Sequence, residues 1–380
     1  MNVELTKDVY LNEYNDTDIE VLEGLEPVRR RPKLWVGSTD ARGLHQLAWY
    51  LVYNCLDEFD AGYCKNISVT VNNDGSLSVE DDGRGIETDV IKKTGKTGIE
   101  TMFTTLGCPT GFELAVVNGL SEKLEVEVFR DGNWYKKSYQ RGKSASPQGL
   151  IGNTEQHGTR VTIWPDRDIF EEAQNSSFDF DTLLVRLREL AYLNKTLRVE
   201  LTDSRNNNRE SFHFYSGISD YLSWLNDAQL KVNKAPIYLS KQQELPEHQD
   251  SLKIECVIQW TDREECLSLV FFNNDNINEE FPLDDLPVDL ASALNKYARA
   301  NQLLNTNCDI SDIELSNGIS AILSIRSQSS LRWLGKEYLR SIVKNVVPEC
   351  FMHYLLHNRD DTKVLIETIA KERASTKTEN

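Results

Sequence analysis

The chain has 380 residues, a length that suits two domains, and its 39% hydrophobic and 27% charged content is that of an ordinary globular protein. Its net charge of −18 argues against coating nucleic acid without sequence preference, because phosphate contacts need a basic surface. No apolar run approaches the roughly 18 residues that cross a bilayer, and the polar, acidic start is unlike a signal peptide. The seven cysteines lack CxxC spacing, so we expect no disulfide framework, no zinc site and a cytoplasmic location.

The first part of the chain predicts strands mixed with helices. Residues 1–15 lack periodicity and are expected to form an arm, followed by a short helix capped by Asp16 or Thr17. A long helix comes next, and Gly43 and Gly62 are expected to close it. The further elements are strands at 66–72 and 76–81, a hairpin at 123–140, a strand at 158–164, a helix at 180–194, strands near 196–202 and 210–215, and a helix at 217–225.

The pattern changes near residue 230. The elements expected there are strands near 252–260 and 267–272, a helix at 293–304, a strand at 319–326, and helices near 336–357 and 360–374. This order predicts an α+β layout in which helices cover antiparallel sheets. We therefore expect an arm (1–15), a first domain (16–228) and a second domain (229–380).

The long helix carries polar residues on one face. Asn54 and Asp57 are three positions apart and share that face with Tyr50, whereas apolar residues from Leu44 to Leu56 recur at helical spacing and predict a buried face. The second strand of the first hairpin ends in Asp81, before an Asp-Gly-Arg-Gly turn. The turn could be only a turn, and the asparagine only a satisfied polar group, but together they indicate a nucleotide-binding domain.

Seven blocks of the chain stand out in this order: DIEVLEGLEPVRRRP, GLHQLAWYLVYNCLDEFDAGYC, DGSLSVEDDGRGI, AVVNGLS, LEVEVFRDG, HGTRVTIWPD and ALNKYAR. Together they resemble the ATPase half of bacterial type II topoisomerases, in both the gyrase B subunit and its topoisomerase IV counterpart. Several long blocks in register are a far more specific signal than a lone glycine motif. The resemblance implies an α+β chain with a GHKL (Bergerat) nucleotide-binding domain followed by a transducer domain of ribosomal S5-like fold.

Within that family's nucleotide site, seven positions of this chain match the pattern. They are Asn54, Asp81, Gly83, Arg84, Gly85, Ile86 and Thr159. The resemblance implies that Asp81 accepts the adenine amino group and that Gly83 and Gly85 let the backbone approach the base. It also implies that Arg84 braces this pocket, that Thr159 helps to hold a water at the base, and that Asn54 ligates a magnesium ion on the phosphates.

The chain departs from the family pattern at the base that activates water. The family has a glutamate four residues before the asparagine, and this chain has Tyr50. A phenol with a pKa of about 10 is almost wholly protonated at neutral pH and does not take a proton from water as a carboxylate does. General-base help is worth roughly 100- to 10,000-fold in rate.

The lid that closes over the triphosphate in the family is shortened here. Only nine residues separate Thr105 from Ala115, and Cys108 and Glu113 replace two of the three loop glycines. Pro109 also removes a backbone N–H donor. Glu113 would place a carboxylate where the resemblance puts phosphate oxygens, and like charges repel.

The third departure is in the transducer, where Leu331 stands at the position of the family's phosphate-contacting lysine and Arg332 is the nearest substitute. Three separate parts of one mechanism are thus altered, which indicates a pseudoenzyme. We also expect no strand cleavage, because no EGDSA-like segment or acidic metal cluster occurs.

The favoured interpretation is therefore a noncatalytic, gyrase-B-like protein that regulates or decoys a topoisomerase or a related partner. Its partner would be a protein, either a second copy or a type II topoisomerase subunit, and an adenine nucleotide would bind weakly if at all. One alternative is a slow ATPase that uses a water chain or a partner's residues. Another is an acidic DNA mimic or structural adaptor, which the charge of −18 suggests.

Overall fold

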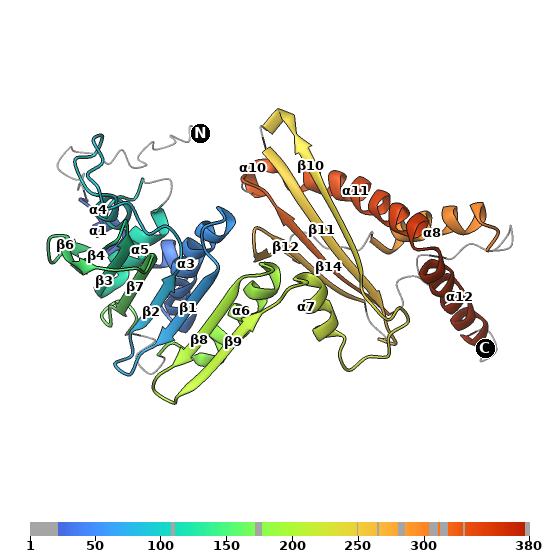
Figure 1. Ribbon diagram of the computed structural model, residues 1–380, viewed down its shortest axis with the longest axis horizontal. Helices are drawn as coiled ribbons and strands as arrows, with labels where there is room; N and C mark the ends of the chain where they lie inside the picture. Colours follow the sequence, from blue (N-terminus) through green and yellow to red (C-terminus); the bar gives the residue numbers. More distant parts are fainter. Residues whose placement is uncertain are drawn as a thin grey trace, which may run out of the picture. The chain divides into compact units, whose positions relative to one another are not determined.

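The computed structural model describes residues 22–107, 111–171, 177–248, 250–263, 266–279, 286–303, 311, 318–329 and 331–376. The chain forms two compact units (Figure 1). The first comprises Met1–Leu184 with Val199–Ser211, and the second comprises Val185–Arg198 with Phe212–Asn380. The arm at 1–15 lies outside the described residues, and the domain boundary after residue 228 stays a prediction.

The first unit is built on a nine-stranded sheet in the order β5-β4-β3-β7-β2-β1-β8-β9, with β6 paired to β4. Its strands are β1 (Asn66–Val71), β2 (Leu77–Asp81), β3 (Ser121–Arg130), β4 (Asn133–Gln140), β5 (Lys143–Ser144), β6 (Gly149–Asn153), β7 (Gly158–Pro165), β8 (Arg198–Asp203) and β9 (Asn208–His213). Strand β2 is central and pairs antiparallel with both β1 and β7. The last residue of β2 is Asp81, so the fold places this carboxylate at the end of a central strand.

Among the described residues of the first unit, helices precede this sheet or lie between its strands. They are α1 (Glu26–Arg30), α2 (Lys33–Val36), α3 (Ala41–Asp60), α4 (Gly98–Thr104) and α5 (Phe112–Leu120). Helix α3 packs on β2, and α5 packs on β3 and β7, so these two helices form the layer next to the sheet. Helices α1 and α4 pack on α5, and α2 packs on α3.

The second unit has a five-stranded sheet in the order β10-β11-β14-β12-β13. Its strands are β10 (Ile237–Leu245), β11 (Asp250–Trp260), β12 (Leu267–Phe272), β13 (Asp275–Asn276) and β14 (Ile319–Arg326). The helices are α6 (Phe180–Leu193), which crosses the division between the units, α7 (Ile218–Leu225), α8 (Leu286–Ala300), α10 (Leu331–Leu334), α11 (Lys336–His357) and α12 (Arg359–Thr376), with a short 3-10 turn at Pro246–His248.

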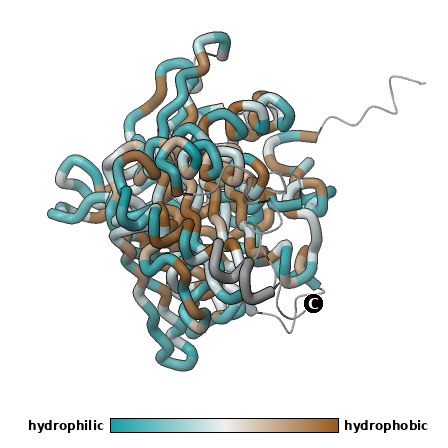
Figure 2. Tube along the Cα trace, turned by 90° about the vertical axis from the view of Figure 1, so that its right-hand side faces the viewer, coloured by the Kyte–Doolittle hydropathy of each residue, from teal (hydrophilic) through white to brown (hydrophobic). Residues whose placement is uncertain are grey.

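Strand β11 explains why the second unit has helices on both sides of its sheet. Successive strand residues face opposite sides. Cys256 and Ile258 belong to the core that includes residues of α8, α11 and α12, whereas Val257 belongs to the core with Tyr221 and Leu222 of α7. The run is therefore apolar without alternation, as in a strand buried on both faces. Figure 2 shows apolar residues concentrated toward the middle of the view and mostly hydrophilic residues on the segments that project from it.

The fold class predicted from the sequence is confirmed, and most predicted elements appear within a few residues of their expected bounds. The predicted N-terminal boundary of α3 is wrong. Asp40 caps the helix by accepting the Arg42 N–H at 2.9 Å, and Gly43 lies inside the helix. A Cβ at Gly43 would lie 1.8 Å from the Ser38 carbonyl oxygen, so this glycine permits close packing rather than ending the helix.

The sequence analysis missed α4, α5 and β10, and also the short elements α1, α2, β5, β6, β13 and α10. Helix α5 has no polar face, since every residue from Leu114 to Leu120 is buried, and its sequence lacks a helical period. Strand β10 is an edge strand with an exposed polar face. The helix predicted at 293–304 starts earlier, at Leu286. In the part of the chain that the structure describes, no helix has the length and apolarity to span a membrane.

Candidate functional site

The site is built on α3, whose two faces differ as the sequence predicts. Leu44, Leu47 and Leu51 are at most 3% exposed and fix the helix against the sheet. The other face carries Tyr50 and Asn54 in half-buried positions. Asn54 makes no side-chain hydrogen bond within the described part of the chain, which leaves its amide available to a ligand.

Asp81 lies beside this helix and is only 5% exposed. Its Oδ1 accepts the Gly83 N–H at 2.8 Å. Burial raises the pKa of Asp81 to about 6, although the Gly83 N–H opposes the rise, and the negative charge of Glu58 adds to it. A buried carboxylate of this kind favours a ligand that offers it an N–H donor, because an unpaired buried charge is costly.

Glycines bring the backbone close around Asp81. Gly85 has a φ of +76°, and a Cβ there would lie 2.9 Å from the Phe129 carbonyl oxygen. Gly158 has a φ of +118°, and a Cβ would lie 1.9 Å from the Asp81 carbonyl oxygen. Both positions need the left-handed conformation and the missing side chain that glycine provides. Gly158 was not among the predicted site residues, although it lies within the HGT block.

Thr159 and Ile86 meet directly. The Ile86 N–H donates to Thr159 Oγ1 at 3.2 Å, and both residues are less than 9% exposed. Thr159 lies on β7, next to the strand that ends in Asp81. The structure thus brings the threonine and the turn after β2 together, while their roles toward a nucleotide stay predictions.

Arg84 lies in the turn after Asp81 and is exposed. Its guanidinium donates to both carboxylate oxygens of Glu58, at 2.7 and 3.0 Å, and lies 4.1 Å above the Tyr63 ring. This bond lowers the pKa of Glu58. The sequence analysis missed Glu58, and it also missed His157, whose Nδ1 lies 3.0 Å from the Gly83 carbonyl oxygen. No sequence spacing links these partners.

The hydroxyl of Tyr50 is a hydrogen-bond donor in this structure. Its hydroxyl donates to the Trp35 carbonyl oxygen at 2.5 Å, and the Trp35 ring packs on Phe112 at the start of α5 with 5.4 Å between ring centroids. Burial raises the pKa of Tyr50, and the negative charge of Glu113 raises it further. The phenol therefore keeps its proton throughout the physiological range.

Glu113 is exposed on the first turn of α5, where its charge is favoured by the helix dipole. Asp57 lies at an exposed position of α3, but desolvation by the surrounding protein raises its pKa to about 6, and Glu113 contributes the largest of the neighbouring charge effects. Glu113 thus lies across from the α3 face that carries Tyr50 and Asp57. The space between α3 and the start of α5 is lined by acids.

A short segment connects α4 to α5, and the two helices contact each other on either side of it. Asn118 on α5 donates to the Phe103 carbonyl oxygen at 2.8 Å, and a Cβ at Gly111 would lie 3.0 Å from the Met102 side chain. Only residues 105–111 join the two helices. Cys108 and Pro109 lie outside the described residues, but the pinned ends leave little chain for a closing loop.

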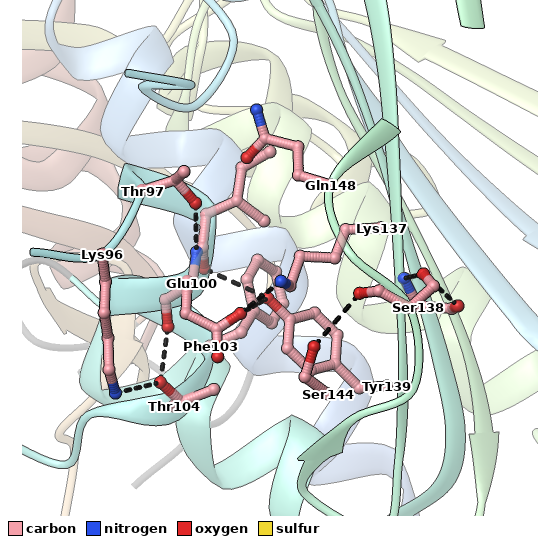
Figure 3. Close-up of polar contacts among 12 residues, drawn as sticks. Lys96, Thr97, Glu100, Phe103, Thr104, Lys137, Ser138, Tyr139, Ser144 and Gln148 are labelled. Carbon is pink, nitrogen blue, oxygen red and sulfur yellow. Dashed lines mark hydrogen bonds and ion pairs between the residues drawn. The ribbon is translucent and has the colours of Figure 1, made fainter. Parts of the chain in front are cut away.

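Helix α4 is also fixed to the sheet (Figure 3). Thr97 caps it by accepting the Glu100 N–H at 3.2 Å, and the Glu100 carboxylate pairs with the buried Lys137 of β4 at 2.5 Å. Tyr139 stacks on Phe103 with 5.7 Å between ring centroids. Since breaking one partner of a buried pair is costly, this contact holds α4 in one place.

In the second unit, the loop before Leu331 is tied to its own sheet. Asp250 accepts the Ser329 N–H at 3.1 Å and the Ser327 hydroxyl. Burial is the largest single effect on the pKa of Asp250 and raises it, but the hydrogen bonds together outweigh burial and lower the pKa to about 2. Asn273 bonds to both the N–H and the carbonyl of Ser327, each at 2.8 Å. Leu331 begins α10, and the side chain of Arg332 lies outside the described residues.

Comparisons with known proteins agree with this architecture. A model of the family "DNA gyrase B" matches residues 217–380, and one of the "Histidine kinase-, DNA gyrase B-, and HSP90-like ATPase" family matches residues 39–169. The gyrase B subunit of Clostridium acetobutylicum is 36% identical over 93% of the chain and 58% of its own length. That of Streptococcus pneumoniae is 32% identical over 98% of the chain and 60% of its own length. The chain thus spans about three fifths of these relatives.

Among solved structures, the 43K ATPase domain of Thermus thermophilus gyrase B, in complex with an aminocoumarin, superposes with a TM-score of 0.82 and 30% identity. It covers 93% of this chain and 97% of that domain. The topoisomerase IV ATP-binding domain of Francisella tularensis, at 23% identity and a TM-score of 0.73, shares the fold over 95% of this chain and 99% of its own. The chain therefore belongs to the gyrase B family, with a GHKL ATPase domain followed by a transducer domain.

Proposed function

We propose that this chain is a gyrase-B-like module that has lost ATP hydrolysis and acts by binding. The observation that carries the proposal is the bond from the Tyr50 hydroxyl to the Trp35 carbonyl oxygen. The resemblance implies a carboxylate base at this position, and a phenol whose proton is already donated elsewhere does not replace it. Loss of a general base alone costs roughly 100- to 10,000-fold in rate.

Two further features support the proposal. Glu113 carries negative charge at the start of α5, where the resemblance implies that phosphates are held. The loop ending at Leu331 has no lysine at the matching position, and Asp250 and Asn273 anchor it within the second unit. Tyr50, Glu113 and Leu331 affect water activation, phosphate binding and the phosphate-contacting lysine, respectively. Restoring one of the three would therefore leave the other two unchanged.

A phosphate-release assay with ATP and magnesium tests the proposal on the full chain. We expect no release above buffer at any protein concentration, and magnesium-dependent release that scales with protein would contradict it. A matched preparation of an active gyrase B ATPase domain serves as the positive control.

Asp57 supports a second candidate function, a slow ATPase. Its pKa of about 6 lets it exchange a proton near neutral pH, and it lies one turn from Asn54 on the same helix. If slow release is found, Asp57→Asn should abolish it, whereas Asp60→Asn, three residues away, should not. Release that survives Asp57→Asn would remove this candidate.

The binding partner is part of the proposal. We propose a second copy of the chain or a type II topoisomerase subunit, with a cytoplasmic location, because the chain keeps both the ATPase and transducer folds. Affinity capture from the native host, with and without nucleotide, tests this directly. Recovery of a topoisomerase subunit or of the chain itself would support it, and recovery of neither would contradict it.

A further inference from the structure

The GHKL fold implies an adenine nucleotide, and the residues of this chain fit only one half of such a ligand. On the base side, the buried Asp81 carboxylate accepts the Gly83 N–H at 2.8 Å. A Cβ at Gly83 would lie 2.7 Å from Asp81 Oδ1, so the glycine keeps a side chain off this oxygen. A heterocyclic amino group suits this carboxylate. On the phosphate side, the start of α5 presents Glu113, and no phosphate group fits beside that carboxylate without repulsion.

Helix α3 places these two regions along one line. Glu58, near the end of the helix, accepts the Arg84 N–H at 3.0 Å, in the turn that follows Asp81. Tyr50, about two turns earlier, donates to Trp35, whose ring packs on Phe112 at the start of α5. Asn54 and Asp57 lie between them on the same helix. A ligand anchored at Asp81 that extends along α3 toward α5 therefore passes Asp57 and meets Glu113.

The start of α5 also shows why a phosphate is not simply attracted there. Helix N-termini favour anions, because their N–H groups are unpaired and the helix dipole is positive at that end. Glu113 supplies this negative charge from within the chain. The Arg84 guanidinium is held by Glu58, so it does not offset the acids.

We propose that Glu113 makes this site selective for adenine ligands without phosphate groups, such as a free nucleoside. The inference rests on the proposed function, since a site that rejects phosphates does not hydrolyse ATP. It goes further by assigning a specificity-determining residue and a ligand class. In this site ATP and ADP bind less tightly than adenosine, and the order follows their charge.

Ligand-linked thermal stabilisation and calorimetry on the full chain test the proposal with adenosine, ADP, and ATP with magnesium. In the unaltered protein adenosine should give the largest shift and ATP the smallest. Glu113→Gln removes the charge and keeps the shape of an exposed side chain. It should tighten ADP and ATP by about tenfold, the effect expected of one nearby charge at intermediate dielectric, and leave adenosine within about twofold.

Two further variants keep the result specific. Glu210→Gln removes an equal charge from an exposed position on β9 and should leave all three affinities unchanged. Asp81→Asn retains an oxygen for the Gly83 N–H but offers an amide to the ligand, and adenosine binding should be lost. Binding of adenosine by Asp81→Asn with unchanged affinity would overturn the assignment of the base side.

Other outcomes also overturn the inference. These are ATP binding tighter than adenosine binding in the unaltered protein, a ratio unchanged by Glu113→Gln, and a complete lack of adenosine binding. Each of them leaves the proposed function standing if phosphate release stays at background. Conversely, phosphate release by the unaltered protein counts against the proposed function, whatever the affinities are.

Discussion

Tyr50 stands where the resemblance implies a carboxylate base, and under the proposed function restoring a carboxylate there should not give activity. Tyr50→Glu should release phosphate from ATP no faster than buffer, because Glu113 and Leu331 are unchanged and the new carboxylate faces other acids. The measurement is steady-state phosphate release with magnesium. A rate near the typical enzyme value of about 10 per second would show that the base was the only missing part.

Tyr50→Phe is the control for the fold. It removes only the hydroxyl that donates to the Trp35 carbonyl oxygen, and it should lower the free energy of unfolding by about 1 kcal/mol. If Tyr50→Phe is much more destabilising than this, loss of activity in Tyr50→Glu would no longer be informative about chemistry.

Asp81 gives a prediction for pH dependence. Its pKa is raised to about 6 in the folded protein, above the usual 3.8, so the folded state holds a proton that the unfolded state releases between these values. Stability should therefore fall as pH rises from about 4 to about 6 and stay lower above it. Asp81→Asn does not titrate and so lacks this loss. Its free energy of unfolding, compared with that of the unaltered protein, should therefore rise by on the order of 3 kcal/mol between pH 4 and pH 7.

Thermal unfolding of both proteins between pH 4 and 7.5 measures this difference. Asp74→Asn is a control of opposite sign, because hydrogen bonds from Ser76 hold the pKa of Asp74 below its usual value. Asp74→Asn should be less stable than the unaltered protein by the same amount throughout this range, because the stabilisation from a lowered pKa is complete above the unfolded value of 3.8. Equal pH profiles for the unaltered protein and Asp81→Asn would contradict the raised pKa.

At the scale of elements, the loop between β14 and α10 should behave as a fixed part of the second unit. Asp250 accepts bonds from Ser327 and Ser329, and these bonds stabilise the loop without any ligand. Hydrogen exchange at 327–329 should be slow and identical with and without an ATP analogue. Asp250→Ala should speed it by about tenfold or more, since lost bonds to a charged group cost about 1.5–3 kcal/mol.

Asp227→Ala is the matched control for this loop, because Asp227 is exposed at the end of α7 in the same unit. It should leave exchange at 327–329 unchanged. Protection of this loop that appears only when the analogue is added would instead show that nucleotide orders it.

Contiguous motifs of the site could be predicted from the sequence, whereas contacts between separate segments could not. The turn that carries Asp81, Gly83 and Gly85 could be placed from the sequence because it is one contiguous motif at the end of a strand, and Thr159 lies in a block of its own; their roles toward a nucleotide stay predictions. The contacts that alter the site join separate segments: Tyr50 to Trp35, and Asp250 to Ser327, which is 77 residues away. No spacing encodes such pairs, so only the folded chain reveals them.

At the scale of the whole molecule, association should be constitutive and indifferent to nucleotide. The resemblance implies that a nucleotide and a closed lid drive two ATPase domains together. In this chain Asn118 ties α5 to α4 and Asp250 holds the loop before Leu331, so we expect nucleotide to rearrange little. Helices α11 and α12 expose Leu356 and Val364 at 50% and 56%, apolar surface that suits a protein contact.

Sedimentation over a range of concentrations, with and without a nonhydrolysable ATP analogue, should therefore give one association constant. Leu356→Glu should weaken the association by about tenfold, because it places a charge in the contact, whereas Leu230→Glu, at an equally apolar exposed site outside these helices, should not. A chain that stays monomeric until the analogue is added would contradict constitutive association and show that nucleotide drives it. In that case the lid and loop would respond to nucleotide after all, and the chain would close as an ordinary clamp.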